Sequence, residues 1–501
     1  MNAKTLLPLL LGATMLAPIA CAPGRSDDDD ALEKRPMSAV LDAPSDAIVP
    51  FEGAGGPTGI GAAPAEDRSI AAPPDLAAEI GSNCSQSFPP PASLPCAVPE
   101  AGAVYYVSPT GSDASDGAAP ERAWATLFHA VRAAAPFSTI RVAAGQYTSA
   151  EVHVDRPLVI KGGFDARFAS WDPDANRTSF FGRLSLAHDH AIWGGFRLVT
   201  RGETDPGASL VETRHHVSGG TLLRNYVEIA WRASRNQHAL TAIVAAPPEG
   251  HRTRLLCNDV YVRGEGASSS PSLDVRGVAY DGAGALGGEA RLSNNRVCVD
   301  RARGVLSAEA VGGAPAGGRG AARVTLTNNL IEAHGDAARG LRSIRGLRFS
   351  SGADDLDVVA TNNTVYSETD GIVGMSGAGR GAIRWTLVNN VVFSRGGRDG
   401  VNVGAEGSSK VTVAESSGNL VFGFMHDAIV PTPRVSRHDD TTGAWTARDV
   451  FGDARLLPRD DGPARRGAVN VFGDPAYGAV RTDVWSSTRP IDGAWTRGAV
   501  Q

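Results

Sequence analysis

The chain has 501 residues, which is more than one ordinary globular domain usually holds. It contains 59 glycines and 31 prolines but only 6% aromatic residues, which predicts many turns and a core of aliphatic side chains. A net charge of −6 argues against a general nucleic-acid-binding protein, which needs a basic surface, and a mean hydropathy of −0.13 excludes a polytopic membrane protein.

The first twenty residues, 1–20, have the features of an export signal. Lys4 supplies a positive charge, residues 6–16 form an apolar stretch too short to span a bilayer, and Ala20 precedes Cys21. This end resembles the signal of a bacterial lipoprotein, and the resemblance implies that Cys21 is lipidated. Alanine at position 22 implies, by the same resemblance, an outer-membrane lipoprotein of the bacterial cell envelope, exposed at the surface. An ordinary signal peptide with an incidental cysteine is the alternative.

Residues 21–102 are predicted to form a disordered linker. The stretch is rich in proline, alanine and glycine, and such a composition buries too little apolar area to offset the entropy of ordering. Four consecutive aspartates at 27–30 could bind calcium, although runs of charge are more often simply solvated.

Apart from Cys21, the chain has four cysteines, and an even number in an exported protein permits disulfides. Cys84 and Cys96 lie twelve positions apart across a proline-rich stretch, so we predict that they pair. Whether Cys257 and Cys298 pair is left open.

An internal repeat is the strongest signal in the sequence. Seven segments carry an asparagine followed two residues later by a β-branched residue, at gaps of 27 to 37 residues. The aligned asparagines are Asn225, Asn258, Asn295, Asn329, Asn363, Asn390 and Asn419.

The apolar residues of each repeat change parity at the asparagine. Val324 and Leu326 lie at odd offsets before Asn329, whereas Val297 and Val299 lie at even offsets after their own asparagine. Alternation of period two predicts strands with one buried face, and the change of parity predicts a corner. We expect the aligned asparagines to adopt the left-handed bend and to form a hydrogen-bonded ladder. In the last repeat the apolar residues are shifted by one, which predicts a bulge near Val413.

Repeats of this length predict a solenoid. Segments at the two ends of the repeat region indicate which kind of solenoid it is. The segments Tyr105–Gly111 and Leu158–Asp165 resemble the first coils of right-handed parallel β-helix (pectin-lyase-like) repeat proteins of bacterial surfaces. Residues 455–458 and 462–464 resemble the closing segment of choice-of-anchor β-helix proteins. The resemblance implies an all-β chain with a single right-handed parallel β-helix over 103–430 and a C-terminal closing segment over 431–501. Helical spacing of apolar residues predicts a cap helix over 122–135, where a solenoid needs its first coil covered.

Enzymes of this superfamily act on acidic polysaccharides, which directs attention to acidic clusters. The best candidate is Asp354, Asp355 and Asp357, with four arginines upstream, but we expect a solvated loop there. The arginines are Arg339, Arg342, Arg345 and Arg348. His188 and His190 would share one face of a strand, yet spacing indicates no further ligands. We therefore predict no metal site and no cofactor, with calcium as a weaker possibility.

The position three residues after the aligned asparagine is aromatic in four of seven repeats, and alternation predicts that it faces outward. These candidate binding residues are Tyr261, Tyr366, Phe393 and Phe422. Exposed rings suit sugars or another protein. The leading hypothesis is a monomeric, non-catalytic surface lipoprotein that binds glycan or a surface partner and no nucleic acid. The alternatives are a polysaccharide lyase or glycoside hydrolase, and a structural spacer.

Overall fold

The computed structural model describes the chain from residue 96, and all of the described residues belong to one compact unit, Ile48–Gln501. The described ranges are 96–203, 211–232, 238–265, 273–282, 288–303, 305–314, 321–335, 343–352, 354–375, 380–403, 410–430, 440–452, 456–478, 480–481, 483–484, 489–491 and 495–500.

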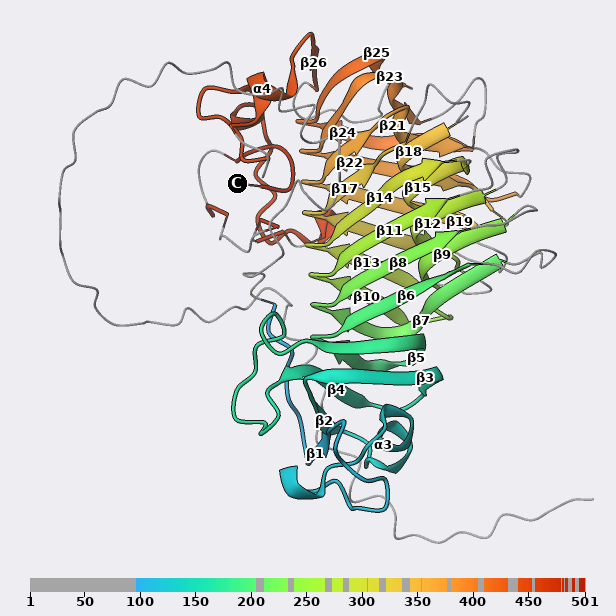
Figure 1. The fold of residues 1–501 in the computed structure, drawn as a ribbon. Coiled ribbons are helices and arrows are strands. Elements are labelled where there is room, and N and C mark those ends of the chain that lie inside the picture. The colour runs from blue at the N-terminus through green and yellow to red at the C-terminus, as the bar shows by residue number, and fades with distance from the viewer. Residues whose placement is uncertain are drawn as a thin grey trace, which may run out of the picture. The chain divides into compact units, whose positions relative to one another are not determined.

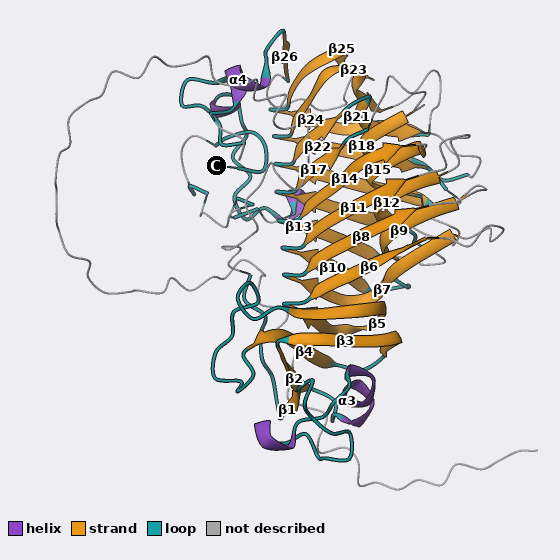
Figure 2. Ribbon diagram, viewed as in Figure 1, coloured by secondary structure: helices purple, strands orange, loops and turns teal. Residues whose placement is uncertain are grey.

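Within these ranges the strands stack in three parallel ladders, one strand from each coil (Figures 1 and 2). The first ladder contains β1 (Val104–Val107), β2 (Ser138–Ala143), β4 (Leu158–Phe164), the ends of β5 (Thr178–Gly194) and β7 (Val211–Leu223), β10 (Arg252–Leu256), β13 (Glu289–Ser293), β16 (Ala321–Thr327), β19 (Asp355–Thr361), β22 (Ile383–Val388) and β24 (Val411–Ser417). The second contains the starts of β3 (Gly145–Val154) and β5, then β6 (Arg197–Glu203), β8 (Tyr226–Arg232), β11 (Asp259–Glu265), β14 (Arg296–Arg303), β17 (Leu330–Ala333), β20 (Thr364–Ser367), the starts of β23 (Val391–Val403) and β25 (Leu420–Val430), and β26 (Thr441–Gly443). The third contains the end of β3, the middle of β5, the start of β7, β9 (His238–Ala245), β12 (Leu273–Tyr280), β15 (Val305–Gly313), β18 (Ser343–Ser350), β21 (Asp370–Met375) and the ends of β23 and β25.

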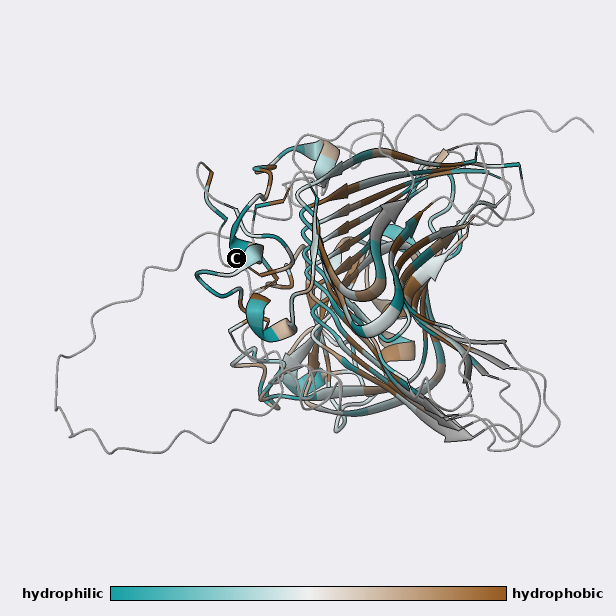
Figure 3. Cartoon of the chain, turned by 90° about the horizontal axis from the view of Figure 1, so that it is seen from above, coloured by the Kyte–Doolittle hydropathy of each residue, from teal (hydrophilic) through white to brown (hydrophobic). Residues whose placement is uncertain are grey.

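The chain is therefore a single right-handed parallel β-helix, as the repeat predicts. Equivalent residues of successive coils stack inside it, and Leu255, Leu292 and Leu326 are each 2% exposed or less. In the view from above, apolar and polar residues alternate along the strands (Figure 3). The predicted bulge is confirmed, because the pairing of β22 with β24 shifts register between Trp385 and Thr386, opposite Val413.

The cap helix is present but shorter than predicted. Helix α3 spans Leu127–Ala133, and the hydroxyl of Thr126 accepts a hydrogen bond from the backbone N–H of His129 at its start. A 3₁₀ turn, η1 (Pro120–Arg122), precedes it. Leu127, Ala130 and Val131 pack into the core of the first coils, so the helix covers the end of the solenoid.

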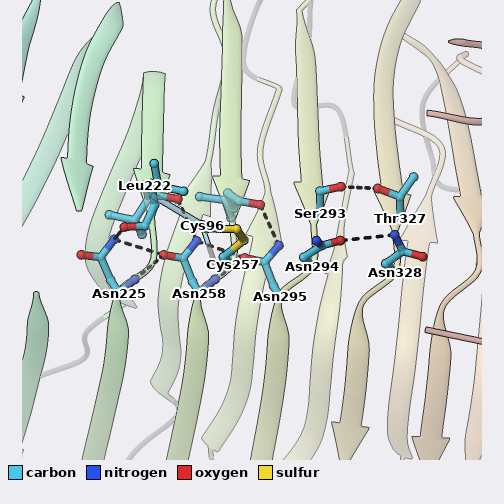
Figure 4. The surroundings of a disulfide bond; sticks show 12 residues. Cys96, Leu222, Asn225, Cys257, Asn258, Ser293, Asn294, Asn295, Thr327 and Asn328 are labelled. Carbon is cyan, nitrogen blue, oxygen red and sulfur yellow. Dashed lines mark hydrogen bonds between the residues drawn. A yellow bond between two sulfur atoms is a disulfide. The ribbon is translucent and has the colours of Figure 1, made fainter. Parts of the chain in front are cut away.

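The aligned asparagines form a continuous buried ladder, part of which is visible in Figure 4. Nδ2 of Asn295 donates to Oδ1 of Asn329 at 3.1 Å and to the carbonyl of Leu255 at 2.7 Å. The expected backbone conformation is wrong by one position, because the residue before each aligned asparagine has the positive φ. Those residues are Arg224, Cys257, Asn294, Asn328, Asn362, Asn389 and Gly418, with φ between 53° and 66°. The left-handed residue turns the chain, which frees the asparagine that follows to point inward.

The C-terminal segment lies partly against the outer side of the second ladder, and around Gly478 it lies against the first ladder. It contains α4 (Ala447–Val450) and the 3₁₀ turns η3 (Pro463–Arg465) and η4 (Pro475–Tyr477). Asn389 binds its backbone through two hydrogen bonds, donating to the carbonyl of Val469 and accepting from its N–H, both at 2.7 Å. The fully buried guanidinium of Arg489 donates to Oδ1 of Asn328 at 3.3 Å. The outward side chains of the left-handed corner therefore hold the segment in place.

The predicted pairing of Cys84 with Cys96 is contradicted at Cys96, which forms a disulfide with Cys257 at a Cα–Cα distance of 6.2 Å (Figure 4). Cys84 lies outside the described residues, and Cys298 is also disulfide-bonded. Cys257 occupies a left-handed corner position, so its side chain points away from the core toward the incoming chain. Residues 96–102, which fall within the predicted linker, are among the described residues. Within the described residues, no helix is long and apolar enough to cross a membrane.

Candidate functional site

A column of charged residues runs along the outside of the third ladder. Each member pairs with the next in strict register from one coil to the following coil. The column is Arg276, Glu309, Arg345, Asp370, Asp399 and His426. Arg276, Glu309 and Arg345 each directly follow a core residue, namely Val275, Ala308 and Ile344, so they face outward.

Glu309 is the first anionic centre of the column. Its carboxylate lies 2.8 Å from Nη1 of Arg348, 3.2 Å from Nε of Arg276 and 3.6 Å from Nη1 of Arg345. One carboxylate therefore fixes three guanidinium groups from two strands, β12 and β18.

Asp370 and Asp399 form the second centre, and Arg398 joins them. Nη2 of Arg398 lies 2.8 Å from Asp370, and its Nε lies 3.2 Å from Asp399. Arg345 approaches Asp370 at 3.4 Å, and Nδ1 of His426 lies 3.1 Å from Asp399. The chain of contacts is thus unbroken from Glu309 to His426.

The carboxylates lie beneath the arginines. The side chains of Glu309 and Asp370 are 2% and 1% exposed, whereas those of Arg276, Arg348 and Arg398 are 34%, 27% and 57% exposed. The solvent-exposed groups here are therefore guanidinium groups, and the buried carboxylates beneath them hold them in position. We call Arg276, Arg345, Arg348 and Arg398 the arginine face.

The pKa values of the two aspartates of the second centre, Asp370 and Asp399, are shifted in opposite directions. Burial raises the pKa of Asp370 above its usual value, although Arg398 and Arg345 oppose this effect. Burial also acts to raise the pKa of Asp399, but hydrogen bonds from Asn402 and His426 and the charge of Arg398 outweigh it, so that this pKa is lowered.

The fixed guanidinium groups can bind anions. Guanidinium binds carboxylate through two parallel hydrogen bonds, and groups held in place lose less freedom when a ligand arrives. The arginine face therefore has the chemistry to bind carboxylates that repeat along a ligand.

A second cluster lies where the chain turns from the third to the first ladder. Oδ1 of Asp189 lies 3.0 Å from Nδ1 of His251 and accepts the backbone N–H of Arg252 at 3.2 Å. The rings of His188 and His190 have centroids 5.7 Å apart. Burial and the charges of His190 and His251 lower the pKa of His188, so His251 acts on the same site as the histidine pair.

Among the described residues, one group already has possible metal-binding atoms within 4.8 Å of one another, namely Cys298, Glu332 and His334. The sulfur of Cys298 is part of a disulfide, so it is not available as the thiolate that binds metals. This group offers no metal site in the oxidised protein.

The aromatic residues Tyr366, Phe393 and Phe422 lie outside the main core as predicted, but their predicted exposure is wrong. Tyr366, Phe393 and Phe422 are each 1% exposed, because the C-terminal segment covers them. The rings of Phe393 and Phe451 lie 5.4 Å apart, which shows this cover directly. Tyr261 is partly buried and donates from its hydroxyl to Asp300 at 3.0 Å.

The acidic cluster of the sequence is not brought together with its arginines. Asp355 and Asp357 lie on β19 of the first ladder rather than in a loop, and Asp354 directly precedes that strand. Arg345 and Arg348 lie on β18 of the third ladder and pair with Glu309 instead. Arg339 and Arg342 lie outside the described residues, and so does Cys21.

The charged column was missed by the sequence analysis, although a signal exists. Its members are 25 to 36 residues apart, much like the asparagine repeat. They lie 7 to 18 positions after the aligned asparagines of their coils, so the asparagine repeat alone does not align them and the strand pairing is needed.

No protein-family profile matches the chain, and no curated protein matches it in sequence. Among solved structures the fold is similar to "Crystal structure of pectate lyase Pel9A", with a TM-score of 0.38 and 13% identity over 79% of this chain and 88% of that one. It is also similar to "Rhamnogalacturonan lyase", with a TM-score of 0.34 and 12% identity over 69% of this chain and 87% of that one.

Proposed function

We propose that this chain is an exported β-helix protein that binds an anionic polysaccharide along the arginine face. The observation that carries the proposal is a row of guanidinium groups fixed over buried carboxylates, with Arg276, Arg345 and Arg398 on every second strand of the third ladder. Strands in neighbouring coils are about 4.8 Å apart, and the arginines lie on every second coil, so the row presents a positive charge roughly every 10 Å along one direction. A linear polymer with regularly spaced carboxylates fits such a row better than a compact ligand does.

Binding through exposed aromatic rings is no longer supported, because Tyr366, Phe393 and Phe422 are buried. The ligand would be held by charge, and we therefore expect strong salt dependence. A neutral glycan should bind weakly or not at all.

The test is affinity electrophoresis through gels that contain polygalacturonate or a neutral glucan. Wild-type protein should be retarded by the anionic polymer, and Arg276→Gln together with Arg398→Gln should reduce the retardation at least tenfold. Arg132→Gln, an exposed arginine on the cap helix, is the matched control and should behave as wild type. Equal binding by the double variant and wild type would refute the arginine face as the site. Failure of wild type to bind any anionic polymer would favour the structural spacer.

Export and membrane attachment are a separate part of the proposal. The disulfide between Cys96 and Cys257 supports an oxidising compartment, and the lipoprotein-like end of the signal supports a lipid on Cys21 in the outer membrane. Cys21→Ser should abolish fatty-acid labelling and release the protein from membranes. Unchanged membrane partition of that variant would exclude the lipid anchor.

Cleavage of the bound polysaccharide is a second candidate function. Asp370 and Asp399 lie opposite each other on neighbouring strands, and their pKa values are shifted in opposite directions. Glycoside hydrolysis uses two carboxyl groups with separated pKa values that flank the scissile bond, and Asp370 would reach a substrate only with Arg398 displaced from it. If this function is present, incubation with polygalacturonate should release new reducing ends, and Asp399→Asn should stop their release. Retardation without products in the same preparation would leave binding alone.

A further inference from the structure

A short insertion in β5 carries three polar residues out of the ladder. The pairing of β5 with β7 is regular up to Leu186 opposite Val217, shifts by one residue to Ala187 opposite Gly219, and resumes at Ile192 opposite Thr221. Between these two pairs β5 has four residues, 188–191, and β7 has only Gly220. The ladder accommodates the excess as a bulge, and bulges redirect side chains away from the regular sheet.

The facing strand, β7, has two glycines where it lies against this bulge. A Cβ at Gly220, whose φ is +86°, would lie 2.5 Å from the carbonyl oxygen of Ala191 and 2.6 Å from that of His188. A Cβ at Gly219 would lie 3.1 Å from Oδ1 of Asp189. Consecutive glycines therefore leave the space that the bulge occupies.

A third imidazole, that of His251 from a later coil, contacts the bulge through Asp189. His188 and His190 are two residues apart with ring centroids separated by 5.7 Å, and Asp189 between them contacts Nδ1 of His251 at 3.0 Å. A carboxylate on one ring nitrogen of a histidine fixes the ring and leaves the other nitrogen for a ligand. Nδ1 of His190 is buried and has no hydrogen-bond partner among the described residues.

We propose that His188, His190 and His251 bind a divalent transition metal of the zinc class, with Asp189 orienting His251 from the second coordination sphere. Imidazole nitrogens are ligands that zinc, copper and nickel prefer, whereas calcium and magnesium prefer oxygen. The side chain of His251 is 49% exposed, and Asp189 contacts its Nδ1, which leaves Nε2 as the nitrogen available to a metal. Sequence spacing shows only the pair, because the third ring comes from 61 residues further along the chain.

The proposal does not depend on polysaccharide binding, since the bulge and the arginine face occupy different coils. Variants of Arg276 and Arg398 should therefore keep the metal site. Each proposal can fail without the other.

The test is calorimetric titration of the untagged, oxidised full-length chain with ZnCl₂. We expect one zinc ion per chain, with the affinity reduced at least tenfold in His188→Ala together with His190→Ala, and in His251→Ala. Asp189→Asn should weaken binding by 10- to 100-fold, as removal of a second-sphere carboxylate does. Thermal unfolding of each variant without metal establishes that it is folded.

Two matched controls separate this site from others. His153→Ala and His426→Ala remove exposed histidines outside the cluster and should bind zinc as wild type does. His334→Ala tests the group that contains Cys298 and should also leave binding unchanged. The proposal is overturned if wild type binds no zinc, if the double variant binds normally, or if His334→Ala alone removes binding.

Discussion

Nδ2 of Asn329 donates to Oδ1 of Asn363 at 2.9 Å, and the backbone N–H of Asn329 donates to the same oxygen at 3.0 Å. Both side chains are buried, so each amide satisfies polar groups that water cannot reach. The coils are therefore joined at this corner by side chains as well as by the strand ladders.

Replacing Asn329 by alanine should destabilise the protein by about 1–3 kcal/mol. The change leaves the buried N–H groups of Asn295 without their acceptor on Asn329 and removes a donor to Asn363. Chemical denaturation measures the effect. Asn470→Ala, on an exposed part of the C-terminal segment, is the control and should cost less. Equal losses in the two variants would mean that the ladder adds nothing specific.

Replacing Leu326 by aspartate should be more damaging than any loss of one ladder amide. Leu326 is fully buried between Leu292 and Ala360 in the stacked core, and a charge there has no partner. We expect little folded protein, judged by circular dichroism and protease resistance. Arg384→Asp introduces the same side chain at an exposed position of β22 and should remain folded. A wild-type melting temperature for Leu326→Asp would disprove the inward orientation.

Non-reducing peptide mapping should recover Cys96 linked to Cys257. This bond closes a loop across a sequence separation of 161 residues, so Cys257→Ser should lower stability by roughly 2–5 kcal/mol. Reduction of the wild type should weaken it in the same direction, whereas the variant should respond less. A free thiol at Cys96 in oxidised protein would contradict the structure.

Acidification should loosen the cap through Asp113. Although burial acts to raise its pKa, hydrogen bonds from the hydroxyl and N–H of Thr126 and from the N–H of Ala125 together lower it. Because the folded-state pKa lies below the unfolded value of about 3.9, the stabilisation is present above that pH and is lost as the pH falls through the folded-state pKa. Melting temperatures between pH 6 and pH 3 measure this loss.

Asp113→Asn is the control for that measurement, because its amide does not titrate. The stability advantage of the wild type over this variant should shrink as the pH falls. A stability advantage that stays constant over the whole pH range would show that ionisation of Asp113 does not stabilise the cap.

The coils could be predicted from the sequence because the alternation of apolar residues within each coil is a local pattern. The alternation around Asn329 and the parity change at the corner are set by which residues the core accepts, and a stack repeats that choice in every turn. The left-handed residue was predicted at Asn329, but it is Asn328. Both arrangements give the same pattern of apolar residues in the sequence.

Contacts between distant segments were not predictable in this way. Phe393 has the alternation of an outward residue, and it does lie outside the main core, but Phe451 covers it from another part of the chain. The partner of Cys96 was missed for the same reason, because proximity in sequence favoured Cys84 over a corner residue at 257. The arginine face depends on register across five strands, which no single repeat reveals.

The C-terminal segment imposes an order on folding. Asn328, Asn362 and Asn389 hold it from three successive coils, and two of them bind its backbone rather than its side chains. This docking surface exists only once those coils have stacked, so the segment docks after the solenoid is built and locks a completed structure. Because Asn362 and Asn389 bind main-chain groups, these contacts do not depend on the side chains of the segment, whereas those of Arg489 and Phe451 do.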